Sequence, residues 1–354
     1  MDLDRLGTVL HELGQPAYRA KQIELAVYRD LAHGYDDIPT IPRPLRQELA
    51  GRMPFDELRL ETTRRSPDGA DKDLFLTQDS LPIESVLIPH ENGSRTVCVS
   101  TEAGCQIGCT FCATGHLGFQ RTLTPFEIVD QVLFFARQLK AAGEKVTNVV
   151  FMGMGEPFLT YEHMRRAILL LNDPDALGLG QRRISVSTSG IVPSIEHFTQ
   201  EQWQVNLAVS LHAPTDALRS QLMPINRTYP LSALMPALDR YVAVTNRRLM
   251  LEYLLLGGIN DSPEDAHRLA DLLRTWPNVS RLGLVNLLTY NPTRDAYGHW
   301  NAFMGPTGRT LATFEDILTA HGIPWTRRVS FGGDVGAACG QLAGEARPPD
   351  ATQL

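Results

Sequence analysis

The sequence has no long apolar run. No stretch approaches the roughly 18 consecutive apolar residues that a membrane-spanning helix needs, so we expect no membrane association. The N-terminal segment MDLDRLGTVLHELGQ is acidic and amphipathic, which is unlike a signal peptide. We therefore expect a cytoplasmic protein, in a compartment where thiols stay reduced. With 354 residues, 43% of them hydrophobic, the chain is long enough for one large folded domain and a small one.

Cysteine is scarce, and overall positive charge is absent. The five cysteines are Cys98, Cys105, Cys109, Cys112 and Cys339. An odd number in a reducing compartment argues against a disulfide framework. The formal net charge of -7 gives no general attraction for nucleic acid. Arginine nevertheless occurs in five adjacent pairs, at 64–65, 165–166, 182–183, 247–248 and 327–328. These pairs could form a track for phosphate groups, and ordinary solvated surface charge is the alternative.

The residue patterns divide the chain into regions. Residues 1–57 show helical spacing and predict a small helical domain. Residues 58–95 contain short strand-like runs separated by the turn-forming segments SPDGAD and HENGS, which predicts a β-hairpin linker region. The core extends over 96–342, and the polar tail 343–354 is predicted to be disordered.

Apolar strands alternate with amphipathic helices from residue 96 onward. The predicted strands are 96–101, 146–153, 183–190, 205–212, 248–256 and 281–290. The predicted helices are 124–142, 161–171, 214–222, 231–244, 263–275 and 308–321. This alternation is typical of an α/β fold with a parallel sheet covered by helices. Six units are too few for an eight-stranded barrel, so we predict a partial (β/α)6 barrel.

Three cysteines form a C-x3-C-x2-C pattern in GCQIGCTFCATGH (104–116), directly after the first predicted strand. In barrels of this kind, functional residues gather at the C-terminal ends of the strands. A structural zinc site is closed by four ligands, and Cys98 or His116 would have to supply the fourth. A 4Fe–4S cluster held by three thiolates instead keeps one iron open for another molecule. Both interpretations stay open at this point.

Polar residues end several of the later strands. These endings are FMGMGEP (151–157), SVSTSG (185–190), SLH (210–212) and YNP (290–292). Glycine lets the backbone approach a ligand closely, and the Glu156 carboxylate could bind an ammonium group. A capped, glycine-rich turn and a structural histidine are the alternative interpretation. Because the C-terminal ends of barrel strands lie together, we predict a ligand over this mouth.

With these motifs in place, the sequence resembles the radical S-adenosylmethionine superfamily, and within it the RlmN/Cfr family of RNA (adenine) methyltransferases. The resemblance covers nearly the whole chain, including RAKQI, ESVLIP, CVSTEAGCQIGCTFCATG, MGMGEP, STSG, SLH and NP. Its most specific part is the ending RVSFGGDVGAACGQL (328–342), in which only Val335 departs from the family pattern. The resemblance implies a radical SAM barrel, one 4Fe–4S cluster and two S-adenosylmethionine molecules per turnover.

The resemblance also implies roles for individual residues. Cys105, Cys109 and Cys112 would hold the cluster, whose open iron would chelate S-adenosylmethionine. Cys339 would carry a methyl group to an adenine ring carbon, and Cys98 would release the product through a transient disulfide with Cys339. Glu84 would be the proton acceptor. The residues implied for S-adenosylmethionine binding are Gly155, Glu156, Ser187, Ser210, Leu211, His212 and Asn291.

The implied substrate is an adenosine of 23S rRNA, methylated at carbon-2, with tRNA as a second substrate. Methylation at carbon-8, as in the Cfr branch, is the alternative, and a zinc-bound, non-catalytic RNA-binding protein is the alternative of a different class. The implied partners are RNA, bound in part by the helical domain, and an electron donor such as flavodoxin or ferredoxin, and we expect a monomer. The aromatic residues Phe119, Tyr290, Tyr297 and Trp300 are candidates for base stacking, with core packing as the alternative. One departure is a long segment after Pro292, in the region 293–310 near the expected RNA entrance.

Overall fold

The computed structural model describes residues 1–293, 299 and 301–343 of the chain. Tyr297, Trp300 and the tail from residue 344 onward lie outside the described residues, and the predictions that concern them stay predictions.

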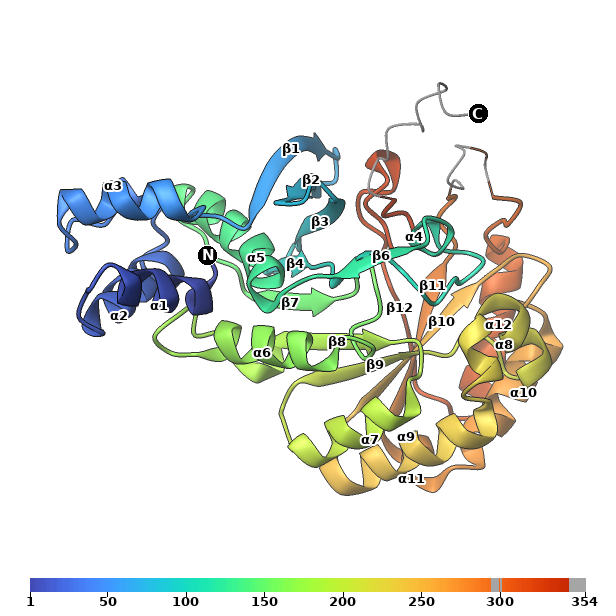
Figure 1. The fold of residues 1–354 in the computed structure, drawn as a ribbon. Helices are drawn as coiled ribbons and strands as arrows, with labels where there is room; N and C mark the ends of the chain where they lie inside the picture. Colours follow the sequence, from blue (N-terminus) through green and yellow to red (C-terminus); the bar gives the residue numbers. More distant parts are fainter. Residues whose placement is uncertain (294–298, 300, 344–354) are drawn as a thin grey trace, which may run out of the picture.

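One mixed sheet forms the centre of the molecule (Figure 1). Within the described residues it has ten strands in the order β1-β2-β3-β4-β7-β8-β9-β10-β11-β12. Strands β1 to β4 are antiparallel to one another, whereas β4 and all the strands after it in this order are parallel. The bounds are β1 Leu58–Arg65, β2 Asp71–Thr77, β3 Pro82–Pro89, β4 Arg95–Cys98, β7 Asn148–Phe151, β8 Ile184–Thr188, β9 Asn206–Ser210, β10 Leu249–Leu255, β11 Gly283–Thr289 and β12 Trp325–Arg327.

The predicted partial barrel is confirmed, because β4 and β7 to β11 correspond to the six predicted strands. Strand β12 adds a short parallel edge that the sequence did not predict. Within residues 58–95, the strands β1, β2 and β3 extend the same sheet. A small second sheet pairs β5 (Glu102–Gly104) with β6 (Phe119–Thr122) around the cysteine loop.

Helices cover the sheet. Helix α5 begins with a capping box, in which Thr124 and Glu127 satisfy each other's backbone N–H groups. The helices of the core are α4 Ala113–His116, α5 Pro125–Ala141, α6 Tyr161–Asn172, α7 Val192–Glu201, α8 Asp216–Leu222, α9 Leu231–Thr245, α10 Pro263–Arg274, α11 Pro277–Leu282 and α12 Gly308–Ala320. Short 3-10 turns lie at Gln181–Arg183, Pro224–Arg227 and Gly333–Val335. Helices α4, α7 and α11 were not predicted. No helix in the described part of the chain is long and apolar enough to cross a bilayer.

The N-terminal helices form a group beside α5, far from α8 and α10 (Figure 1). They comprise α1 Leu3–Glu12, α2 Tyr18–Glu24, the π-helix η1 Leu25–Arg29, the 3-10 turn η2 Tyr35–Asp37 and α3 Arg43–Arg52. Arg137 of α5 reaches Asp56 through a 2.9 Å ion pair, and the carboxylate of Asp130 accepts the N–H groups of Glu57 and Leu58. These contacts join the segment that follows α3 to helix α5.

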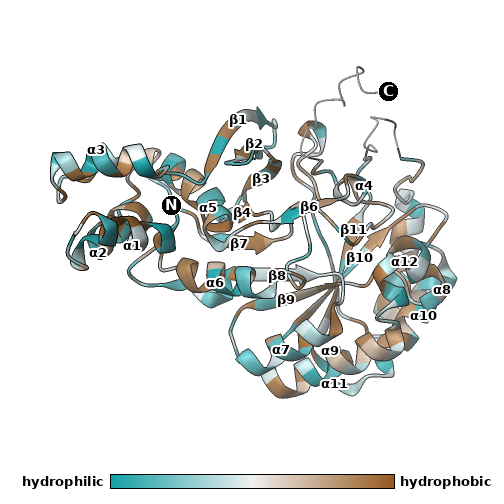
Figure 2. Cartoon of the chain, viewed as in Figure 1, coloured by the Kyte–Doolittle hydropathy of each residue, from teal (hydrophilic) through white to brown (hydrophobic). Residues whose placement is uncertain are grey.

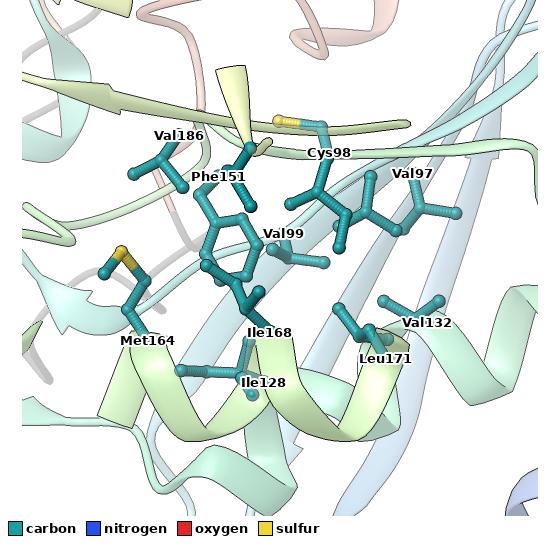
Figure 3. Packing of buried hydrophobic residues seen from close by; sticks show 14 of the residues in the cluster. Val97, Cys98, Val99, Ile128, Val132, Phe151, Met164, Ile168, Leu171 and Val186 are labelled. Carbon is teal, nitrogen blue, oxygen red and sulfur yellow. The ribbon is translucent and has the colours of Figure 1, made fainter. Parts of the chain in front are cut away.

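Alternation along β4 separates the core from the functional side. Strands β7, β10 and β11 are mostly apolar, whereas the helices carry both polar and apolar residues (Figure 2). Val97 and Val99 face α5 and α6, where they lie with Ile128, Val132 and Ile168, all of them fully buried. Cys98 points to the opposite face of the strand (Figure 3). A single apolar strand therefore supports the core on one face and presents a thiol on the other.

Candidate active site

The three cysteines of the C-x3-C-x2-C pattern line one cavity at the C-terminal ends of the parallel strands. Its volume is about 170 Å³. The loop that carries these cysteines is tightly folded, because a Cβ on Gly115 would lie 2.7 Å from the carbonyl oxygen of Cys109. Burial raises the pKa of the Cys105 thiol to about 12 and the pKa of Cys109 well above its ordinary value. Metal binding would therefore have to displace protons from these thiols.

The donor set fits an iron–sulfur cluster by its chemistry. Cys105, Cys109 and Cys112 line the same cavity, and soft thiolates are the ligands that such clusters take.

The end of β7 forms one wall of this cavity through Gly155 and Glu156. Gly155 has φ +104°, and a Cβ there would lie 2.7 Å from the side chain of Glu102, so only glycine fits. The Glu156 carboxylate is buried and accepts the N–H groups of Phe158 at 2.9 Å and Ser189 at 2.6 Å. Burial raises the pKa of Glu156, as it raises that of Glu102 to about 7.

His212 follows β9 and contributes a neutral imidazole to the same cavity. Its Nδ1 accepts the N–H of Leu254 at 3.0 Å, so the ring proton must lie on Nε2. Burial lowers the pKa of His212 to about 3. The residue has φ +55°, a left-handed conformation that is rare for a side-chain-bearing residue and is often found at functional sites. Phe111 of the cysteine loop lies edge-on to its ring at 5.0 Å between centroids.

Arg219 of α8 holds the ends of β8 and β9 together. Its guanidinium is fully buried and donates to the carbonyl oxygens of Ser189 at 2.7 Å, Ser210 at 2.9 Å and Leu211 at 3.1 Å, and to Asn226 Oδ1 at 2.8 Å. None of these acceptors is a carboxylate. Burial lowers the pKa of Arg219 to about 10, at which it stays charged at neutral pH.

A second, larger cavity of about 1050 Å³ lies beside the first. Cys98 lines this second cavity only, whereas Met152, Leu288, Arg328 and Cys339 line both. One guanidinium nitrogen of Arg328 lies 3.4 Å from Met152 Sδ and 3.9 Å from a carboxylate oxygen of the buried Glu252. The two cavities therefore meet at Cys339, with a cation beside them.

Comparison with known proteins identifies the family of the chain. Residues 99–273 match the model of the radical SAM superfamily. A probable dual-specificity RNA methyltransferase RlmN of Chloroflexus aurantiacus is 44% identical over 98% of this chain and 93% of its own length. The dual-specificity RNA methyltransferase RlmN of Anaeromyxobacter dehalogenans is 42% identical over 98% of this chain and 91% of its own. The crystal structure of a radical SAM methyltransferase from Sphaerobacter thermophilus superposes with a TM-score of 0.90, at 46% identity and 98% coverage of both chains.

The chain belongs to the RlmN/Cfr family of radical SAM RNA methyltransferases. It is therefore an S-adenosylmethionine-dependent enzyme that acts on RNA by a radical mechanism, with a 4Fe–4S cluster as cofactor. This membership excludes the non-catalytic, zinc-bound alternative.

The structure brings most residues that the family resemblance implied to the first cavity, although their individual roles stay predictions. Gly155, Glu156, Ser187, Ser210 and His212 line it together with the three cysteines. Leu211, by contrast, is fully buried and is not part of the cavity wall.

Two other implied residues lie elsewhere. The Asn291 amide lies outside the first cavity's lining and donates to the Ser330 hydroxyl at 3.3 Å. Glu84 lines neither cavity, is fully buried, and forms a 3.0 Å ion pair with Lys72.

Sequence reasoning missed three charged residues of this RlmN/Cfr site, namely Arg219, Glu252 and Arg328. Arg328 had a signal, because it is the first residue of the ending RVSFGGDVGAACGQL. Glu252 had a weak one, as a single carboxylate inside an apolar strand. Arg219 had none, because its partners are mainly backbone carbonyls. Among the stacking candidates, Phe119 is 43% exposed, whereas Tyr290 is buried, lines the first cavity and lies edge-on to Phe303.

Proposed function

We propose that this enzyme methylates carbon-2 of an adenosine in 23S rRNA, and also an adenosine in tRNA, with Cys339 carrying the methyl group. The observation that supports this proposal is the meeting of the two cavities at Cys339. One cavity contains the three cluster cysteines and the other contains Cys98. A group bound to the Cys339 sulfur can therefore face the cofactor on one side and a nucleotide on the other.

The names of the relatives support the position and the substrates. The similar curated proteins are named dual-specificity RNA methyltransferase RlmN, and the RlmN branch acts at carbon-2, whereas the Cfr branch acts at carbon-8. We take the dual specificity to mean ribosomal RNA and tRNA.

The first cavity would bind S-adenosylmethionine through the residues at the strand ends. Gly155, Glu156 and Ser187 would hold its methionine part beside the cluster loop, and His212 Nε2–H would donate to an oxygen or nitrogen atom of the adenosine part. When bound, the cluster and S-adenosylmethionine supply one-electron cleavage of a carbon–sulfur bond. We expect two S-adenosylmethionine molecules per turnover, the first as the methyl donor to Cys339.

Cys339 is partly exposed, as a methyl acceptor must be. Its thiolate would form a sulfur–carbon bond to the methyl group as the sulfonium–methyl bond breaks, and its proton would pass to solvent. Cys98 would later attack the Cys339 sulfur, so that a disulfide forms as the sulfur–carbon bond to the base breaks. The electron pair of that bond would stay on the carbon, which would take a proton and become the methyl group of the base. An external thiol reductant would then return the disulfide to two thiols. Burial raises the pKa of Cys98 to about 12, while the nearby Arg328 cation opposes that shift. Cys98 is thus a weak nucleophile until its surroundings change, which would keep it from reacting before the base is attached.

The target adenine must leave its base stack to enter a cavity in the protein.

The arginine pairs give limited support for a phosphate track, because many of these arginines have protein partners. Arg165 pairs with Glu201, Arg166 with Asp4, and Arg327 with Glu315. We propose that the N-terminal helical domain supplies the main RNA contacts, that the enzyme acts as a monomer, and that flavodoxin or ferredoxin provides the electron.

The proposal is tested by nucleoside analysis of RNA methylated in vitro by the anaerobically reconstituted protein. We expect 2-methyladenosine in a 23S rRNA fragment and in tRNA, and we expect Cys109→Ala to lose both the visible absorption of the cluster and the product. Detection of 8-methyladenosine would assign the protein to the Cfr branch, and the absence of any methylated adenosine would overturn the proposal.

A further inference from the structure

Two of the five arginine pairs lie together at the end of the sheet that is opposite to the first cavity. The segments that enter β8, β9, β10 and β11 are residues 178–183, 202–206, 243–248 and 278–282. Because these four strands are adjacent and parallel, their N-terminal ends share one side of the sheet. The four segments contain no aspartate or glutamate and five arginines, which form the arginine cluster: Arg182, Arg183, Arg247, Arg248 and Arg281. In a chain of net charge -7, this cluster is a local excess of positive charge.

Amide groups, rather than carboxylates, orient three of these guanidinium groups. Arg182 Nε donates to Gln204 Oε1 at 2.6 Å, and Arg247 donates to Asn206 Oδ1 at 2.8 Å. The amide of Asn206 also donates to the Arg182 carbonyl oxygen at 3.0 Å, so one side chain joins the two pairs. Arg281 likewise donates to the side-chain oxygen of an asparagine at 2.9 Å. An amide oxygen carries no formal charge, so these arginines are held in place without being neutralised.

The other two arginines of the cluster, Arg183 and Arg248, are exposed. Their side chains form no hydrogen bond or ion pair with any residue that the structure describes. In the other arginine pairs, by contrast, Arg165, Arg166 and Arg327 each form an ion pair with a carboxylate. The fold therefore leaves the charge of the arginine cluster available to an anionic partner.

The chemistry of the cluster favours the phosphate groups of RNA. Arginine presents a planar fork of N–H donors that matches phosphate oxygens, and the four segments contain no lysine. The chain belongs to a family of RNA methyltransferases, so RNA is the polyanion that it meets. An electron donor does not suit this place, because it has to approach the cysteines at the other ends of the strands. Strand β10, for example, has seven residues and is therefore roughly 20 Å long.

We propose that the arginine cluster is a second RNA-binding surface, which contacts the phosphate backbone of the substrate RNA far from the adenosine that enters the cavity. The proposal rests on the RNA substrate proposed above, and it does not depend on which carbon is methylated. It implies that the enzyme distinguishes RNAs by size. A large folded RNA can reach both ends of the strands, whereas a short stem–loop that contains the target adenosine cannot.

The test measures binding of the anaerobically reconstituted enzyme to tRNA, to a long 23S rRNA fragment and to a short stem–loop. The variant Arg183→Gln/Arg248→Gln removes two exposed charges without breaking a contact within the described part of the chain. The matched control, Arg268→Gln/Arg309→Gln, removes two exposed arginines from α10 and α12, outside the four segments. Dissociation constants are measured at several salt concentrations. Methylation of Cys339 without RNA is measured alongside, to show that the variants keep an intact site.

We expect Arg183→Gln/Arg248→Gln to bind tRNA and the long fragment about tenfold more weakly or worse, because two phosphate contacts are lost. The slope of log K against log salt concentration should become shallower by about 1.5. The stem–loop should bind this variant as it binds the wild type, and the control variant should bind all three RNAs normally.

Unchanged tRNA binding and an unchanged slope would overturn the proposal. So would an equal loss for the stem–loop or in the control variant, because it would reflect net charge alone. Normal RNA binding, with turnover lost only when flavodoxin replaces dithionite as the reductant, would assign the cluster to an acidic protein and would also overturn the proposal. If the wild type forms no 2-methyladenosine, the proposed function fails, while the binding measurements still decide the role of the arginine cluster.

Discussion

Replacing Arg219 with methionine tests how the ends of β8 and β9 are held. Methionine has a similar length and no hydrogen-bond donors. The substitution leaves the carbonyl oxygens of Ser189, Ser210 and Leu211 and the side-chain oxygen of Asn226 without their donor, at a side chain that has no exposed surface.

Each buried acceptor without a partner costs about 1–3 kcal/mol. The buried guanidinium itself carries a desolvation cost of several kcal/mol, and the substitution removes that cost. This gain offsets part of the loss from the four unpaired acceptors. We therefore expect Arg219→Met to lower the free energy of unfolding by roughly 3–5 kcal/mol. Arg219→Lys keeps the charge but lacks the planar fork that reaches four acceptors, so we expect roughly half of that loss.

The assay is urea unfolding of cluster-free protein, followed by circular dichroism under reducing conditions. The matched control is Arg227→Met, at an exposed arginine of the same region, for which we expect a change within about 0.5 kcal/mol. A stability of Arg219→Met within that same range would refute the reasoning, because it would mean that water satisfies these carbonyl groups.

Three further predictions concern the site and the sheet. Gly155→Ala should weaken S-adenosylmethionine binding at least about tenfold in equilibrium dialysis, because the added Cβ would collide with Glu102 and because alanine does not tolerate the positive φ of this residue. Unchanged binding would contradict the proposed position of S-adenosylmethionine beside Gly155. Asp73→Asn should stabilise the fold by roughly 2 kcal/mol near pH 8 and by nothing near pH 4. Burial raises the pKa of Asp73 to about 6, although a hydrogen bond with Thr63 opposes that shift. The stability of the neutral form is therefore present at low pH and lost as the pH rises through 6; the same difference in urea midpoint between variant and wild type at both pH values would contradict this. Cys98→Ala should accumulate an RNA–protein adduct on denaturing gels, because no thiol would then release the base from Cys339. Free methylated RNA without an adduct would contradict the proposed role of Cys98 in product release.

The sequence predicts the barrel well because each parallel strand is an apolar run between turn signals. Helix α7 was not predicted, although its sequence contains a helix signal. Pro193 lies in its first turn, and Ile195 and Phe198 follow at helical spacing. Strand β12 was not predictable, because Trp325–Arg327 is three residues long and mostly exposed.

Within the site, the cysteine pattern and the polar strand ends predict residues that the structure brings to one cavity. The contacts that cross the fold could not be predicted. Glu84 meets Ala343 across 259 positions of sequence, and it does so through a backbone N–H that any residue other than proline provides. Arg219 likewise reaches backbone carbonyls 8, 9 and 30 residues away. Side-chain identity carries no record of such partners, so only the fold reveals them.

The central claim is that the methyl group reaches RNA through Cys339. The direct measurement loads Cys339 with an isotopically labelled methyl group, removes free S-adenosylmethionine, and then adds RNA, reductant and unlabelled S-adenosylmethionine for a single turnover. We predict that mass spectrometry finds the labelled carbon in the 2-methyladenosine of the product. An unlabelled methyl group in that nucleoside, with the label retained on Cys339, would contradict the claim.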